Sequence, residues 1–130
     1  MKILVVDDEV DVRTLFEQRF RREIRSGAFT FSFAYSGEEA LNYLHSHLSE
    51  VVLILSDINM PGMSGLELLR RVKQEYAAPP PNPPLVMMIT AYGDTESYNQ
   101  AMQLGANDFL TKPVDFAALK EKLFSLEDKL

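Results

Sequence analysis

Five short apolar segments alternate with segments of helical period along the whole chain, and this alternation limits its possible folds more than any other feature. Four of the segments are continuous apolar runs, as expected of strands covered on both faces of a parallel sheet; they lie at 3–6, 51–56, 85–90 and 108–111. The fifth, FTFSFAY at 29–35, alternates, which is typical of a strand nearer a sheet edge. Right-handed β–α pairs in strict alternation predict a doubly wound α/β fold with one parallel sheet.

The segments between the strands predict five helices. The first covers about 10–25, with an apolar stripe that includes Leu15, Phe16, Phe20 and Ile24. The second and third each begin with a serine followed three residues later by a glutamate, the capping-box pattern: Ser36 with Glu39, and Ser64 with Glu67. The fourth follows Asp94 and stops at Gly105, and the last begins near Asp115. The proline-rich segment at 78–84 is interpreted as a stiff surface connector.

Length and charge limit the classes of partner. The chain has 130 residues, so we expect one domain over 1–130, either alone or as the first part of a longer protein. A net charge of −6 with scattered Lys and Arg argues against direct nucleic-acid binding. The N-terminal apolar run is too short for the apolar core of a signal peptide, and no apolar run approaches the roughly 18 residues of a membrane span, so we expect a cytoplasmic protein without a membrane partner.

Charged and polar residues gather at the carboxyl ends of the predicted strands. They are Asp7 and Asp8 after the first strand, Asp57 after the third, Thr90 at the end of the fourth and Lys112 after the fifth. The carboxyl ends of parallel strands share one edge of the sheet, and ligands bind there. We therefore expect three carboxylates, one hydroxyl and one ammonium group to converge.

Three carboxylates in one crevice need a counter-charge. Two of them about 4 Å apart, at an effective dielectric constant near 20, repel by roughly 4 kcal/mol. A hard cation such as Mg²⁺ relieves this repulsion and prefers oxygen ligands, so the sequence predicts Mg²⁺ as a cofactor. The alternative is a solvated turn in which Asp7 or Asp8 only caps the following helix.

Four motifs, in this order and spacing, resemble the receiver domain of bacterial two-component response regulators. They are VVDDE at 5–9, LSDINMPGMSGLELL at 55–69, MITAYG at 88–93 and GANDFLTKP at 105–113, and the resemblance extends over essentially the whole chain. It implies a flavodoxin-like, five-stranded parallel sheet of order 2-1-3-4-5 with five helices. It also implies a regulatory phosphoacceptor that catalyses only its own phosphorylation and dephosphorylation, rather than an enzyme.

The resemblance assigns roles by matching position. It implies that Asp57 accepts the phosphoryl group from a sensor histidine kinase or phosphotransfer protein. Mg²⁺ is then held by Asp7, Asp8, Asp57 and the backbone carbonyl of Asn59, and Lys112 pairs with the aspartyl or phosphoryl oxygens. The peptide bond between Lys112 and Pro113 is expected to be cis.

The same resemblance implies a switch and an output surface. Thr90 is the expected switch hydroxyl and Phe109 the switch aromatic. The output surface consists of the helix after Asp94, the strand at 108–111 and the last helix, and it controls an output domain or effector or forms a homodimer. Asn59 and Tyr92 are expected to set the lifetime of the phosphoryl group, and a bulky Tyr92 shields it from water.

Three other functions fit the residues less well. A flavin-binding electron carrier of the same fold needs a phosphate-binding loop rich in Ser, Thr and Gly after the first strand, where this chain has Asp7, Asp8 and Glu9. A phosphatase with an aspartyl nucleophile would need a nearby acid and an insertion that covers the substrate. A receiver fold that acts only as a scaffold would not need the complete set of site residues.

Overall fold

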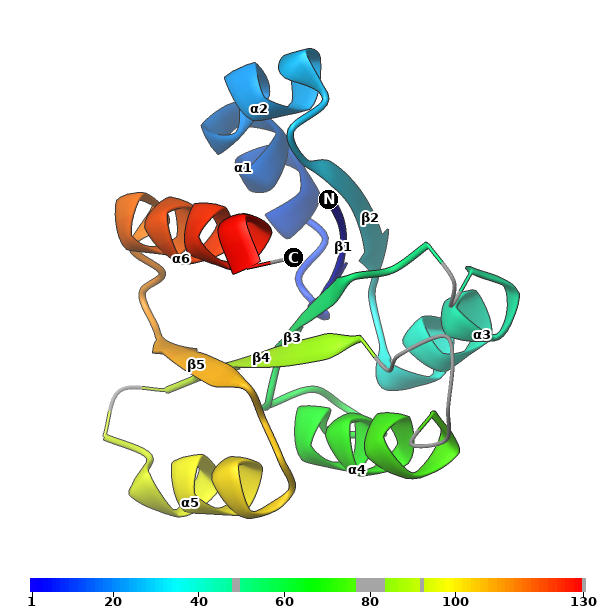
Figure 1. Cartoon of the computed structure of the whole chain (residues 1–130). Helices are drawn as coiled ribbons and strands as arrows, with labels where there is room; N and C mark the ends of the chain where they lie inside the picture. Colours follow the sequence, from blue (N-terminus) through cyan, green and yellow to red (C-terminus); the bar gives the residue numbers. More distant parts are fainter. Residues whose placement is uncertain (48–49, 77–83, 92, 130) are drawn as a thin grey trace.

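Five parallel strands form one sheet in the order β2-β1-β3-β4-β5 (Figure 1). The computed structural model describes residues 1–47, 50–76, 84–91 and 93–129. The strands are β1 (Lys2–Val6), β2 (Thr30–Ala34), β3 (Leu53–Asp57), β4 (Leu85–Thr90) and β5 (Asp108–Thr111). All four neighbouring pairs are parallel, so the predicted flavodoxin-like sheet and its strand order are confirmed.

Helices cover both faces of the sheet. One face is covered by α1 (Val12–Arg19) and α6 (Phe116–Lys129), and the other by α3 (Gly37–His47), α4 (Gly65–Glu75) and α5 (Thr95–Gln103). The side chains of β1 show how the two layers form: Ile3 and Val5 pack with Phe16 of α1, whereas Leu4 and Val6 belong to the core under α3 and α4. Burial on both faces explains why the central strands are continuously apolar.

The first predicted helix is interrupted, so the described part of the chain has six helices instead of five. Phe20 has φ −111° and ψ 25°, outside the helical region, and it separates α1 from α2 (Arg21–Ser26). The fully buried Phe20 ring packs against Phe29 and Phe31, with ring centroids 6.0 and 5.0 Å away. The turn at Phe20 ends the apolar stripe, and Ile24, predicted to face the core, is 37% exposed.

The predicted helix ends are present. The hydroxyl groups of Ser36 and Ser64 accept the backbone N–H of Glu39 and Glu67 at 3.1 and 3.2 Å. Gly105, just after α5, has φ +95°, the left-handed conformation expected of a helix end. The proline-rich connector lies, except for Pro84, outside the described residues. None of the described helices combines the length and apolarity that a membrane crossing requires.

Candidate functional site

Three carboxylates converge at the carboxyl edge of the sheet. β1 and β3 are neighbours, and their register pairs Val6 with Ser56, so the residues that follow, Asp7 and Asp57, also lie side by side. One carboxylate oxygen from each of Asp7, Asp8 and Asp57 lies within 4.8 Å of the other two. Asp7 and Asp57 are buried, whereas Asp8 is exposed. The expected convergence of acidic strand ends is therefore present.

Lys112 reaches the same place from the end of β5. Its Nζ donates a hydrogen bond to Asp57 Oδ2 at 2.6 Å. Its backbone N–H donates to the carbonyl oxygen of Thr90 at 2.8 Å, which ties the start of the β5–α6 connection to β4. The peptide bond between Lys112 and Pro113 is cis. The ammonium group is thus held against the most buried carboxylate of the cluster.

The carboxylates of this cluster outnumber the positive charges beside them. Burial raises the pKa of Asp7, the neighbouring Asp57 carboxylate adds to the rise, and the backbone N–H of Glu9, 3.0 Å from Asp7 Oδ1, opposes it. Burial alone would lower the pKa of Lys112, but the hydrogen bond and the charge of Asp57 outweigh it and the pKa is raised. One ammonium group faces three carboxylates, so this donor set fits a hard divalent cation such as Mg²⁺.

Of the other residues predicted for the site, Asn59 contacts the cluster directly. The backbone N–H of Asn59 donates to Asp57 Oδ1 at 3.2 Å, and the Asn59 side chain is exposed. Thr90 is buried, and its hydroxyl donates to the carbonyl oxygen of Leu110 at 3.4 Å, toward β5. Phe109 is half-buried in β5. Tyr92 lies outside the described residues.

Gly65 is a site residue that sequence reasoning did not identify. It is the first residue of α4, and its N–H donates to the carbonyl oxygen of Ile58 at 2.8 Å. A Cβ atom at this position would lie 2.1 Å from the backbone oxygen of Asp57. The start of α4 therefore packs directly on the backbone of Asp57. The available signal was a glycine immediately after the helix cap Ser64, a position that does not otherwise need one.

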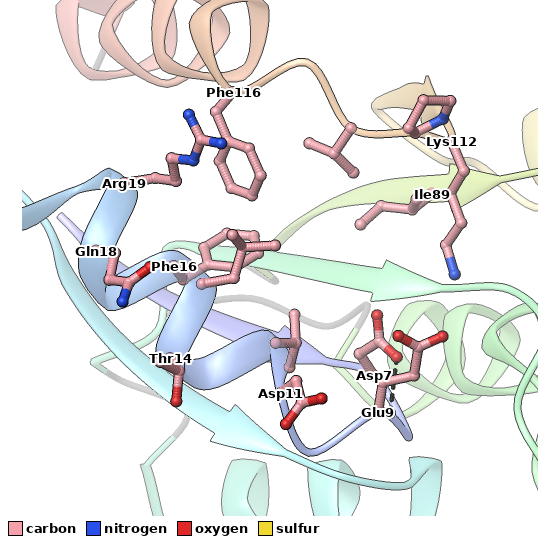
Figure 2. Close-up of a pocket in the computed structure, with 14 residues that line it drawn as sticks. Asp7, Glu9, Asp11, Thr14, Phe16, Gln18, Arg19, Ile89, Lys112 and Phe116 are labelled. Atoms are coloured by element: carbon pink, nitrogen blue, oxygen red, sulfur yellow. Dashed lines mark hydrogen bonds between the residues drawn. The ribbon is translucent and has the colours of Figure 1, made fainter.

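A groove of about 870 Å³ leads to the cluster (Figure 2). It runs between α1 and the segment from Lys112 to Phe116, with Asp7 and Glu9 also in its wall. Leu15, predicted to face the core, lines this groove instead and is 40% exposed. The groove forms between segments about 100 residues apart in the sequence, so helical periodicity could not distinguish its wall from the core.

The ion pair of Lys112 with Asp57 is expected to stabilise the wild type until Lys112 loses its proton in alkaline solution. Lys112→Met should lack this stabilisation at every pH. The folded-state pKa of Lys112 lies above its usual value of 10.5. Its contribution to the free energy of unfolding is therefore fully present below the unfolded-state pKa and disappears as the pH rises through the folded-state pKa. Urea unfolding between pH 9 and 12 should show a steeper decline above about pH 10.5 for the wild type than for the variant.

The matched control for this titration is Lys129→Met, at an exposed lysine in the last turn of α6. It should decline in parallel with the wild type. Parallel curves for Lys112→Met and the wild type would show that the ion pair with Asp57 does not stabilise the fold.

Known proteins match this chain along most of its length. A model of the response regulator receiver domain family matches residues 3–124. Response regulator RppA of Synechocystis sp. is 32% identical over 127 residues, which are 98% of this chain and 50% of RppA. Response regulator protein PilR of Pseudomonas aeruginosa is 39% identical over 123 residues, 92% of this chain and 24% of PilR. The chain thus spans half or less of the length of these two relatives.

Solved structures agree with the sequence matches. A response regulator receiver domain protein from Clostridium thermocellum superposes with a TM-score of 0.82 at 25% identity, covering 98% of this chain and 94% of that one. A response regulator receiver protein from Pseudomonas putida gives a TM-score of 0.78 at 32% identity, covering 95% and 94%. Together with the sheet order and the cluster of acidic strand ends, these similarities show that the chain belongs to the receiver domain family of two-component response regulators.

Proposed function

We propose that this chain accepts a phosphoryl group on Asp57 in a Mg²⁺-dependent reaction and transmits the change through the face formed by α5, β5 and α6. The observation that carries the proposal is the contact of Lys112 Nζ with Asp57 Oδ2 at 2.6 Å, inside a cluster with Asp7 and Asp8. A buried carboxylate held between a cation and two further carboxylates suits a charge-neutralised nucleophile better than a structural ion pair.

The proposed chemistry is an attack of an Asp57 carboxylate oxygen on phosphorus. A P–N bond of a phosphohistidine, or a P–O bond of a small acyl phosphate, breaks as the new P–O bond forms, and the donor leaves with the electron pair. Lys112 neutralises charge on the aspartyl and phosphoryl oxygens, and the backbone N–H of Asn59 keeps Asp57 oriented. Asp7, Asp8, Asp57 and the backbone carbonyl of Asn59 would hold Mg²⁺, which would supply further positive charge to the phosphoryl oxygens.

The proposed donor is a sensor histidine kinase or a phosphotransfer protein. A donor histidine must approach Asp57 from outside the sheet, and the groove along α1 opens at that edge. Its apolar wall, with the half-exposed Leu15 and Phe116, is suited to an apolar stripe of a donor helix. The chain would then act as a regulatory phosphoacceptor and not as an enzyme with a separate substrate.

The proposed response is a shift between two packings of the output face. A phosphoryl group on Asp57 adds strong acceptors near the end of β4, and these compete with the Leu110 carbonyl for the Thr90 hydroxyl. Movement of Thr90 would let Phe109 turn inward and would change the surface of α5, β5 and α6. That surface would contact an output domain, an effector or a second copy of the chain.

Incubation with acetyl phosphate and Mg²⁺ should add one phosphoryl group to the wild type, detected by intact mass. Asp57→Ala should abolish the adduct, because the nucleophile is lost. Asp128→Ala, at an exposed carboxylate on α6, is the matched control and should retain it. A chelator should also prevent the reaction.

An adduct that persists in Asp57→Ala would contradict the proposed phosphoacceptor, and one that forms equally well with chelator would contradict the role of Mg²⁺. The decay of the same adduct measures its lifetime. We propose that Asn59 and Tyr92 set this lifetime, and faster decay in Tyr92→Ala would support shielding by that ring.

A further inference from the structure

We propose that Tyr98 of α5 is a positioning residue that holds Phe109 in its present half-buried orientation and so sets how readily the switch responds. This inference rests on the proposed phosphoacceptor function. It adds to that function a residue outside the motifs that resemble the family. Tyr98 would act only through Phe109, without touching the phosphoryl group.

The contact between the two rings is close and directional. Their centroids lie 4.2 Å apart and their planes are inclined at 62°, an edge-to-face arrangement. The other described contacts between phenylalanine rings involve α1, β2 and α6 on the opposite side of the sheet. The Tyr98–Phe109 pair is therefore separate from the main aromatic core and joins α5 to β5 directly.

A hollow next to this pair gives Phe109 space to move. It has a volume of about 170 Å³, and its wall includes Thr90, Tyr98, Phe109 and Thr111. Thr90 is paired with Thr111 across β4 and β5, and its hydroxyl is bonded to the Leu110 carbonyl. The hollow thus lies between the proposed switch hydroxyl and the two rings, and Tyr98 borders the route that Phe109 would take.

A contact made in one orientation of Phe109 biases the equilibrium toward that orientation. Edge-to-face pairs contribute enough to change such an equilibrium by roughly 2- to 10-fold. If phosphorylation favours a ring turned further inward than it is here, a residue that favours the present orientation must oppose phosphorylation by the same factor, because the two effects are linked. Removing the Tyr98 ring should therefore make the free protein resemble the switched state more often.

The test places 4-fluorophenylalanine at position 109 and measures the populations of its ¹⁹F signals in the unphosphorylated protein. Tyr98→Ala is expected to increase the population of the inward ring roughly 2- to 10-fold. Tyr98→Phe, which keeps the ring, should match the wild type. Tyr98→Leu, which keeps volume without an aromatic ring, should behave like Tyr98→Ala. Met102→Ala, at an exposed residue one turn further along α5, controls for changes on the helix surface.

The second readout is the affinity for beryllofluoride with Mg²⁺, a mimic of aspartyl phosphate, measured by calorimetry. This affinity should rise in Tyr98→Ala by no more than the factor by which the inward population of the ring increases. Tyr98→Phe should bind with the affinity of the wild type. Unchanged or reduced inward populations in both Tyr98→Ala and Tyr98→Leu would overturn this inference while leaving the phosphoacceptor proposal intact. A wild type that neither binds beryllofluoride nor accepts phosphoryl from acetyl phosphate would overturn both.

Discussion

Gly65→Ala is expected to lower the free energy of unfolding by about 1 to 3 kcal/mol and to slow phosphorylation of Asp57 at least tenfold in whatever protein remains folded. A methyl group at Gly65 would lie 2.1 Å from the backbone oxygen of Asp57 and 2.8 Å from the Cα atom of Ile58. Both atoms belong to the backbone, so no side-chain rotation can relieve the overlap. Either α4 or the end of β3 must move.

The sign of the change in the free energy of unfolding shows whether tertiary contact or helix propensity dominates at position 65. Alanine inside a helix is favoured over glycine by up to about 1 kcal/mol, so propensity alone predicts that Gly65→Ala stabilises the protein. The contact with Asp57 reverses that expectation. Because the displaced backbone carries the proposed nucleophile, the same change should misalign Asp57 with Lys112, whose Nζ lies 2.6 Å from Oδ2.

Gly37→Ala is the matched control, because Gly37 is the first residue of α3. A Cβ atom there would meet the side chain of Met63, which can adjust in part. The two variants are compared by urea unfolding and by the rate at which each forms the phosphoryl adduct from acetyl phosphate. If Gly65→Ala cost no more than Gly37→Ala and kept the wild-type rate, the close packing of α4 on Asp57 would have no functional importance.

Asp7→Asn is expected to stabilise the protein without metal at neutral pH and to remove most of the stabilisation by Mg²⁺. Burial raises the pKa of Asp7, so the folded state binds this proton more tightly than the unfolded state does. The corresponding contribution to stability is present below the unfolded-state pKa and is lost as the pH rises through the folded-state value. Above the folded-state pKa the ionised Asp7 therefore costs stability, and asparagine avoids that cost.

Thermal unfolding with and without Mg²⁺ measures both parts of this prediction. An ion at 100 times its dissociation constant stabilises the wild type by about 2.7 kcal/mol, whereas Asp7→Asn should respond much less. The metal-free difference between the two proteins should shrink as the pH falls through the raised folded-state pKa of Asp7, because the carboxylate becomes protonated. Asp11→Asn removes an exposed carboxylate that makes no capping hydrogen bond, and it should show neither effect.

Equal Mg²⁺ responses in the wild type and Asp7→Asn would show that Asp7 does not bind the ion. A metal-free variant less stable than the wild type would show that the buried carboxylate is better satisfied than its raised pKa indicates.

Much of the fold could be predicted from residue patterns because the information is local. Continuous apolar runs marked the buried strands, and their alternation with helical segments was enough to predict a doubly wound sheet. Ser36, Ser64 and Gly105 marked helix ends through interactions within one turn. The gathering of Asp7, Asp57 and Lys112 also followed, because every parallel strand delivers its carboxyl end to the same edge.

Other features depend on contacts between distant segments, which no periodicity records. The break at Phe20 accompanies packing of its ring against β2, and Leu15 is half-exposed because a groove, not core, lies beside it. The ring of Tyr98 meets Phe109 only because α5 packs beside β5. Patterns along the chain thus established which elements form and which edge carries the chemistry. Steric fit across the assembled layers decided where the first helix breaks, why position 65 excludes a methyl group and which ring faces Phe109. Each of these features depends on atoms that become neighbours only after folding.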